Sequence, residues 1–194
     1  MSQSSLIKRV KEKTEFSGIL DSLVSEKINE VTKKYGLPKN KSEEKVIVSE
    51  VRNSLRKLSG RFQKSIKKRK KYSREEKYDE LLATHSSTSE RKDFYPELKK
   101  IIFSKGTKSI LDLGCGLNPV ALATKEVKYY ACDIKQDELE TIKSFFKKNK
   151  ISGEVFTCDL RNESSFPPAD TCLILKVFDI IGPNNHNITK KIIS

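Results

Sequence analysis

A glycine-containing loop stands in the middle of the chain, in the segment ILDLGCGLNPVALA at 110–123. Apolar residues lead into Gly114 and Gly116, and glycine there permits a tight turn and a close approach of the backbone to a ligand. A loop that cradles a pyrophosphate needs a third glycine and free N–H groups at the start of the next helix. Asn118 and Pro119 stand there instead, and proline has no N–H to donate. The loop therefore predicts a nucleoside ligand without a phosphate, such as S-adenosylmethionine.

Three aspartates lie at or near the ends of predicted strands: Asp112 before the loop, Asp133 in YYACDI and Asp159 in VFTCDL. In open α/β sheets, ligands bind at the carboxyl ends of the strands. Asp133 follows Gly114 by 19 residues, the spacing of a carboxylate that accepts hydrogen bonds from ribose hydroxyls. The alternative for Asp133 is a cap on the helix that follows. Asp159 is expected to bind the exocyclic amine of adenine.

The second half of the chain alternates apolar, β-rich stretches with helical ones. The expected strands are 109–113, 129–134, 154–158 and 171–178, and a helix is expected at 137–148. This alternation predicts an α/β domain, residues 85–194, with a parallel sheet and crossover connections. The connections after the first and third strands are short, so their helices should span only a turn or two.

The first half, residues 1–84, is expected to form a helical module without strands. It holds 22 of the 39 Lys and Arg but 12 of the 26 Asp and Glu, a net charge of +10 out of +13. Such an excess of positive charge favours a polyanionic partner, with nucleic acid ahead of a membrane surface. Gly36 and Pro38 should end one helix, Ser42 should begin the next, and Ser73 with Glu76 should form a capping box for a short third one.

The segment KSIKKRKK at 64–71 carries six basic residues in eight. We expect these side chains to contact RNA phosphates, which would give affinity and orientation without base specificity. The alternative is a solvated helix face. The predicted contacts are Lys64, Lys67, Lys68, Arg69, Lys70 and Lys71.

The composition indicates neither a membrane protein nor a metalloprotein. No apolar run approaches the ~20 residues of a membrane helix, and the N-terminus lacks an apolar signal core. None of the four cysteines, Cys115, Cys132, Cys158 and Cys172, forms a C-x-x-C pair. We therefore expect a cytoplasmic monomer with buried, reduced thiols and no metal.

Three segments together resemble the 16S ribosomal RNA guanine-N7 methyltransferases that confer aminoglycoside resistance. They are HSSTSERKDFYPEL at 85–98, the glycine loop at 110–123 and LILKVFD at 173–179. The resemblance covers about residues 80–180. It implies a Rossmann-like class I methyltransferase core, preceded by a helical module that binds 16S rRNA in the 30S subunit, with S-adenosylmethionine as cofactor.

The resemblance also implies roles for individual residues. His85 and Arg91 would lie near the amino-acid end of the cofactor, where Arg91 could pair with the carboxylate. Lys176 would lie near the target base and is the catalytic candidate, because a lysine inside an apolar strand is costly unless it reaches a cleft. The remaining predicted cofactor residues are Asp112, Gly114, Gly116, Asn118, Asp133, Asp159 and Leu160.

Methylation at guanine N7 would need little acid–base help, because N7 carries a lone pair and no proton. In-line positioning and exclusion of water would suffice. The sequence lacks the Pro-Cys pair of cytosine-C5 enzymes, and the segment FPPA at 166–169 is not the motif of exocyclic-amine enzymes. The target base would have to be splayed from its stack.

Two alternatives remain at this stage: a non-catalytic RNA- or ribosome-binding relative, or an inactive fragment of one, and a small-molecule methyltransferase. Sheets of this class have about seven strands, whereas four are expected here, and the last apolar strand would leave an open edge. We therefore expect the core at 85–194 to be truncated at its C-terminal end.

Overall fold

The computed structural model describes residues 2–60, 66–104, 106–162, 165–178 and 190. The chain forms two compact units, residues 1–61 and 62–194. The sequence placed the boundary after residue 84. The structure differs because α5 (Ile66–Arg74) and α6 (Tyr78–Leu82) pack against helices of the second unit.

The first unit is helical, as the sequence predicts. It contains α1 (Gln3–Lys11), α2 (Thr14–Ser17), α3 (Asp21–Tyr35), α4 (Lys41–Leu55) and the π-helical turn η1 (Arg56–Gly60). Gly36, with φ of 81°, ends α3 as predicted. The start of α4 lies earlier than expected, because the Asn40 side chain accepts hydrogen bonds from the N–H groups of Ser42 and Glu43.

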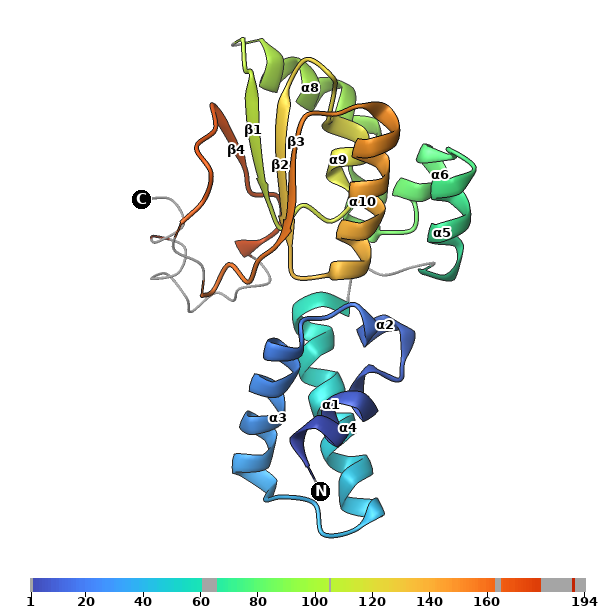
Figure 1. The fold of residues 1–194 in the computed structure, drawn as a ribbon, viewed down its shortest axis with the longest axis vertical. Coiled ribbons are helices and arrows are strands. Elements are labelled where there is room, and N and C mark those ends of the chain that lie inside the picture. Colours follow the sequence, from blue (N-terminus) through green and yellow to red (C-terminus); the bar gives the residue numbers. More distant parts are fainter. Residues whose placement is uncertain (1, 61–65, 105, 163–164, 179–189, 191–194) are drawn as a thin grey trace. The chain divides into compact units, whose positions relative to one another are not determined.

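The second unit holds a four-stranded parallel sheet in the order β3-β2-β1-β4 (Figure 1). The strands are β1 (Ser109–Leu113), β2 (Lys128–Asp133), β3 (Gly153–Thr157) and β4 (Thr171–Leu173). The parallel sheet is confirmed, and the first three strands match their predicted ranges to within one residue. The fourth was predicted to run to residue 178, but it ends at Leu173. Lys176 has a φ of 61°, which an extended strand cannot accommodate.

The helices of this unit lie on one side of the sheet (Figure 1). Besides α5 and α6, the unit contains α7 (Ser86–Glu90), the 3-10 turn η2 (Lys92–Phe94), α8 (Tyr95–Phe103), α9 (Asn118–Leu122) and α10 (Gln136–Asn149). The five-residue α9 confirms the short first crossover. Ser73 lies inside α5, so the predicted capping box at this position is wrong. No helix in the described ranges is long and apolar enough to cross a membrane.

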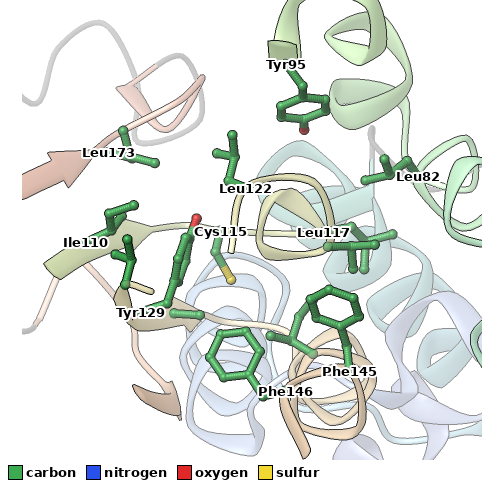
Figure 2. Close-up of a cluster of buried hydrophobic side chains, with 14 of the residues drawn as sticks. Leu82, Tyr95, Ile110, Cys115, Leu117, Leu122, Tyr129, Phe145, Phe146 and Leu173 are labelled. Atoms are coloured by element: carbon green, nitrogen blue, oxygen red, sulfur yellow. The ribbon is translucent and has the colours of Figure 1, made fainter. Parts of the chain in front are cut away.

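The core between the sheet and these helices is built around Tyr129, which is fully buried (Figure 2). Its ring meets Phe146 of α10 edge to face, with the centroids 6.0 Å apart. Leu117, Leu122 and residues of α6 and α8 belong to the same cluster. Alternate strand residues point to the other face, where Leu111, Leu113, Tyr130 and Cys132 pack with Leu160 and Val177.

The burial of the four cysteines depends on their place in the sheet and the strand ends. Cys115, Cys132 and Cys158 are buried thiols, as predicted, and no cysteine forms a disulfide. Cys172 is exposed, which contradicts the prediction for this residue. It lies on β4, which has a neighbour on only one side in the described sheet.

Gly153 at the start of β3 provides a test of this packing. Its φ is 143°, and a Cβ there would overlap the backbone of Tyr129 on β2. We expect Gly153→Ala to lower the free energy of unfolding by about 3 kcal/mol, since steric overlap and backbone strain each cost roughly 1–3 kcal/mol. Urea denaturation measures this. Gly106→Ala is the control, because Gly106 also has a positive φ (69°) but no atom within 4 Å of a Cβ. Equal losses in the two variants would contradict the packing argument.

Candidate functional site

The glycine loop leaves the carboxyl end of β1 in a left-handed turn. Gly114 and Gly116 have φ of 68° and 50°, values that favour glycine. The N–H of Cys115 donates to the carbonyl of Cys132 at 2.9 Å, which fastens the loop to β2. A Cβ on Gly114 would lie 2.5 Å from Cγ2 of Val177, and one on Gly116 would lie 3.4 Å from the His85 ring. The loop thus depends on glycine for both its conformation and its close contacts.

Asp133 ends β2 beside this loop. Its carboxylate accepts hydrogen bonds from the N–H groups of Gly116, at 2.9 Å, and Lys135, at 3.1 Å. Burial raises the pKa of Asp133 to about 6, and the neighbouring charge of Glu138 acts in the same direction. The N-cap residue of α10 is Lys135, so Asp133 bonds the backbone just before the helix and does not occupy the cap position itself. A carboxylate has about four acceptor positions, which leaves room for ribose hydroxyls.

Asp112 and Asn118 form a buried polar network next to the loop. Asp112 accepts a hydrogen bond from the Tyr129 hydroxyl at 2.7 Å and a long one from the Asn118 amide at 3.5 Å. The Asn118 carbonyl oxygen accepts from Tyr95 at 2.8 Å and from Arg91 at 2.9 Å. Asp112 and Asn118 are no more than 1% exposed. Although both were predicted to bind the cofactor, in the structure they support the loop and Arg91.

Arg91 is held from two sides. Its Nη2 donates to Ser87 Oγ at 2.7 Å and to Asn118, while its Nε is buried without a hydrogen-bond partner. A buried donor without a partner is costly, so such groups call for an explanation. A bound carboxylate would explain the unpaired Nε, because a guanidinium donates paired hydrogen bonds to a carboxylate. This orphaned donor and the glycine loop that a Cβ would fill are compatible with the predicted cofactor.

His85 is buried against the loop. Its Nε2 lies 3.7 Å from Oε2 of Glu138, which is itself only 1% exposed. Burial lowers the pKa of His85, and the attraction of Glu138 opposes this effect while Arg69, Lys135 and Arg91 add to it. Burial therefore favours the neutral form of the imidazole.

The basic run divides into two kinds of residue. Lys67, Lys68, Lys70 and Lys71 are exposed on α5, whereas Lys64 lies outside the described residues. Arg69 is 2% exposed, and its Nη1 lies 3.3 Å from Oε1 of Glu138. The prediction that Arg69 contacts RNA phosphates is contradicted by this burial, because the guanidinium is used inside the protein.

Asp159 and Leu160 follow the end of β3. The Asp159 carboxylate is paired with the Arg161 side chain through two hydrogen bonds, of 2.9 and 2.6 Å. Arg161 is not among the predicted site residues, although a basic residue two positions after a strand-end acid is a visible signal. Leu160 is buried in the cluster with Val177, whose side chain contacts Gly114.

Lys176 lies beyond β4 and not inside it. Its ammonium forms an ion pair with Glu90, and both side chains are largely exposed. Glu90 is the last residue of α7 and immediately precedes Arg91. The ion pair therefore brings Lys176 to the segment that holds Arg91.

Glu138 is the main functional candidate that sequence reasoning missed. It lies on α10 at the spacing i, i+4, i+7 with Ile142 and Phe145, on the buried stripe of the helix. A carboxylate at such a position is a signal of a buried partner. Its partners, Arg69 and His85, come from distant parts of the sequence, so the signal does not identify them.

The chain matches known proteins along much of its length. A family model described as Ribosomal RNA methyltransferase (FmrO) matches residues 76–188. A 16S rRNA (guanine(1405)-N(7))-methyltransferase of Serratia marcescens is 34% identical over 105 residues, which are 52% of this chain and 41% of that protein. The chain thus aligns with about two fifths of the length of this curated relative.

Two solved structures have the same fold. The 16S rRNA methylase RmtB superposes with a TM-score of 0.80 at 21% identity, over 100% of this chain and 80% of that one. The 16S rRNA methyltransferase RmtF in complex with S-adenosyl-L-homocysteine gives a TM-score of 0.80 at 18% identity, over 100% and 78%. At these identities the likeness concerns the fold, and it agrees with the predicted Rossmann-like core.

The burial of Asp112 predicts a pH-dependent stability. Burial raises its pKa to about 7, against the hydrogen bonds from Tyr129 and Asn118. Between about pH 4 and 7 the folded state therefore holds this proton while the unfolded state has released it, so the free energy of unfolding should fall as pH rises. Asp112→Asn should flatten this dependence, most clearly between pH 6 and 7.5, above the pKa of Asp133.

Urea denaturation at several pH values measures the effect. Asp170→Asn is the control, because hydrogen bonds from the backbone N–H groups of Lys108 and Ser109 lower the pKa of Asp170, and it does not titrate in this range. An Asp112→Asn variant with the wild-type slope would show that another group carries the pH dependence.

Proposed function

The chain belongs to the ribosomal RNA methyltransferase (FmrO) family, because the family model matches more than half of the chain. We propose that the protein methylates N7 of a guanine in small-subunit ribosomal RNA with S-adenosylmethionine as the methyl donor. The guanine-N7 specificity follows that of the Serratia marcescens relative, a 16S rRNA (guanine(1405)-N(7))-methyltransferase. The observation in the structure that supports the proposal most is the buried, unpartnered Nε of Arg91 next to the glycine loop.

The residues around the loop are suited to distinct parts of this cofactor. Arg91, held by Ser87 and Asn118, would pair with the carboxylate of the methionine moiety. Asp133 would accept hydrogen bonds from the ribose while it keeps its bond to the Gly116 N–H. Asp159 already accepts three hydrogen bonds from Arg161 and one from Asn162, so it would exchange the long Asn162 bond of 3.3 Å for the adenine amine. Leu160 would pack against the base.

The reaction that we propose places few demands on acid–base groups. S-adenosylmethionine supplies a methyl group activated by its sulfonium. Guanine N7 has a free lone pair, so the protein has to align the base, desolvate it and stabilise the extruded nucleotide. Lys176 is the candidate for contact with the base, since its ion pair with Glu90 holds it next to Arg91. No metal takes part in this proposal.

RNA binding would come from the basic surfaces of the chain. Four lysines on α5 are exposed, and residues 1–84 carry most of the net positive charge. Phosphate contacts of this kind orient an RNA duplex without reading its sequence. We propose that the protein acts as a cytoplasmic monomer on the 30S subunit.

Incubation of the protein with 30S subunits and S-adenosylmethionine labelled in the methyl group tests the proposal. We expect label in 16S rRNA, and aniline-induced strand scission should map it to an N7-methylated guanine. The 50S subunit is the control. Cofactor binding without label transfer would overturn the enzymatic proposal in favour of a non-catalytic RNA-binding relative. Transfer to a small molecule alone would overturn the RNA substrate.

The exposed lysines of α5 give a second prediction. Replacing Lys67, Lys68, Lys70 and Lys71 by Gln, with the buried Arg69 retained, should weaken binding to 30S subunits. Each lost phosphate contact should lower the slope of log K against log salt by about 0.7–0.9. Cofactor affinity should not change, because these side chains are exposed.

Filter binding over a range of salt concentrations measures the slope. The matched control is Lys143→Gln with Lys147→Gln, which removes two exposed lysines from α10. If the α5 variant keeps the wild-type slope, the basic run is a solvated helix face.

A further inference from the structure

Glu138 is a buried carboxylate that the proposed reaction does not use. It is 1% exposed, and it lies within 3.3 Å of the Arg69 guanidinium and 3.7 Å of the His85 imidazole. One of its oxygens is 3.6 Å from the position that a Cβ on Gly116 would occupy, and the His85 ring is 3.4 Å from the same position. Glu138 and His85 therefore both lie beside Gly116 of the glycine loop.

Burying the Arg69–Glu138 ion pair costs more free energy than filling this space with apolar side chains. Removing two charges from water costs several kcal/mol each, and well-packed apolar side chains of similar size often give equal or greater stability. The neighbours of Glu138 on the buried stripe of α10, such as Leu139 and Ile142, are apolar. Stability alone does not account for a charged pair here, whereas an ion pair fixes the direction of its partners.

The partners of Arg69 extend the connection to the segment before His85. Arg69 Nε donates to Thr84 Oγ1 at 3.3 Å, and the Thr84 hydroxyl donates to the carbonyl of Leu81 at 2.6 Å. Thr84 immediately precedes His85 in the sequence. Arg69 thus orients both Glu138, which faces the His85 ring, and the residue that sets the His85 backbone.

We propose that Arg69 and Glu138 are positioning residues for cofactor binding, which act by holding the His85 ring against Gly116 and so fix the glycine loop in its binding conformation. The inference rests on the proposed function, because it assigns the loop to S-adenosylmethionine. Arg69 also stands between Lys68 and Lys70 on α5, so the helix proposed to grip RNA is fastened to the cofactor loop through this pair.

The experiment separates positioning from stability with three variants. Glu138→Gln removes the nearer of the two described carboxylates beside Arg69 and leaves Asp137, at 3.9 Å, so both stability and affinity should fall. The double variant Arg69→Met, Glu138→Leu removes both charges of the pair and leaves the partly exposed Asp137, so its stability should recover relative to Glu138→Gln. Its dissociation constant for S-adenosylhomocysteine should nonetheless stay at least tenfold above the wild-type value. Glu140→Gln is the matched control on the exposed side of α10.

Calorimetric titration with S-adenosylhomocysteine and urea denaturation supply the two readouts, and nuclear magnetic resonance of the His85 ring supplies a third. The ring resonances should shift in Glu138→Gln and in the double variant, but not in Glu140→Gln. Should the double variant not fold, Glu138→Asp takes its place, because it keeps the charge but withdraws the carboxylate from His85; it too should bind at least tenfold more weakly.

The outcomes distinguish the two proposals. A double variant, or Glu138→Asp in its place, that binds S-adenosylhomocysteine as tightly as the wild type overturns the inference, because the pair is then merely structural. A wild-type chain that does not bind the ligand overturns the proposed function together with this inference. Weak binding by the variants alone, with stability recovered in the double variant, supports both.

Discussion

The second unit is organised around one buried carboxylate, that of Asp112. Its oxygens accept hydrogen bonds from Tyr129 at the centre of the core and from Asn118 at the start of α9. Asn118 in turn fixes Arg91 and Tyr95, so the glycine loop, the core and the segment before α8 share one network. In a site of low dielectric constant each bond in such a network is strong, and each missing bond is costly. The arrangement of Arg91 therefore depends on a residue that never reaches the surface.

The features that could be predicted from the sequence are those that the local pattern of residues determines. The first three strands, α10, the glycine loop and the acid at the end of β2 were all visible as apolar runs, glycine positions and spacing. These features arise from interactions between residues close in sequence, or from strand ends that any parallel sheet brings together. The resemblance supplied the family and the expected roles of His85 and Arg91, which composition and periodicity alone did not indicate.

The remaining features depend on contacts between distant parts of the chain. The basic run at 64–71 has one uniform appearance in sequence, yet Arg69 is buried by a carboxylate that lies about 70 positions later. The apolar stretch at 171–178 predicts one long strand, but the chain turns at Lys176, whose ion-pair partner is in α7. The same long-range packing brings α5 and α6 into the second unit. The local pattern marks Glu138 as a carboxylate on a buried stripe, but it does not identify the partner in either pairing.

The start of α9 affects which cellular nucleotides can bind at the glycine loop. Pro119 offers no N–H at the first turn, and the Asn118 side chain is directed inward to Asp112, Arg91 and Tyr95. A loop of this kind lacks the donors that make other glycine loops bind ATP and dinucleotides. Abundant nucleotides would then compete poorly for the proposed cofactor site, and its occupancy would follow the supply of the methyl donor and the accumulation of its demethylated product. Such a protein would respond to methyl-group metabolism and hardly at all to the energy charge.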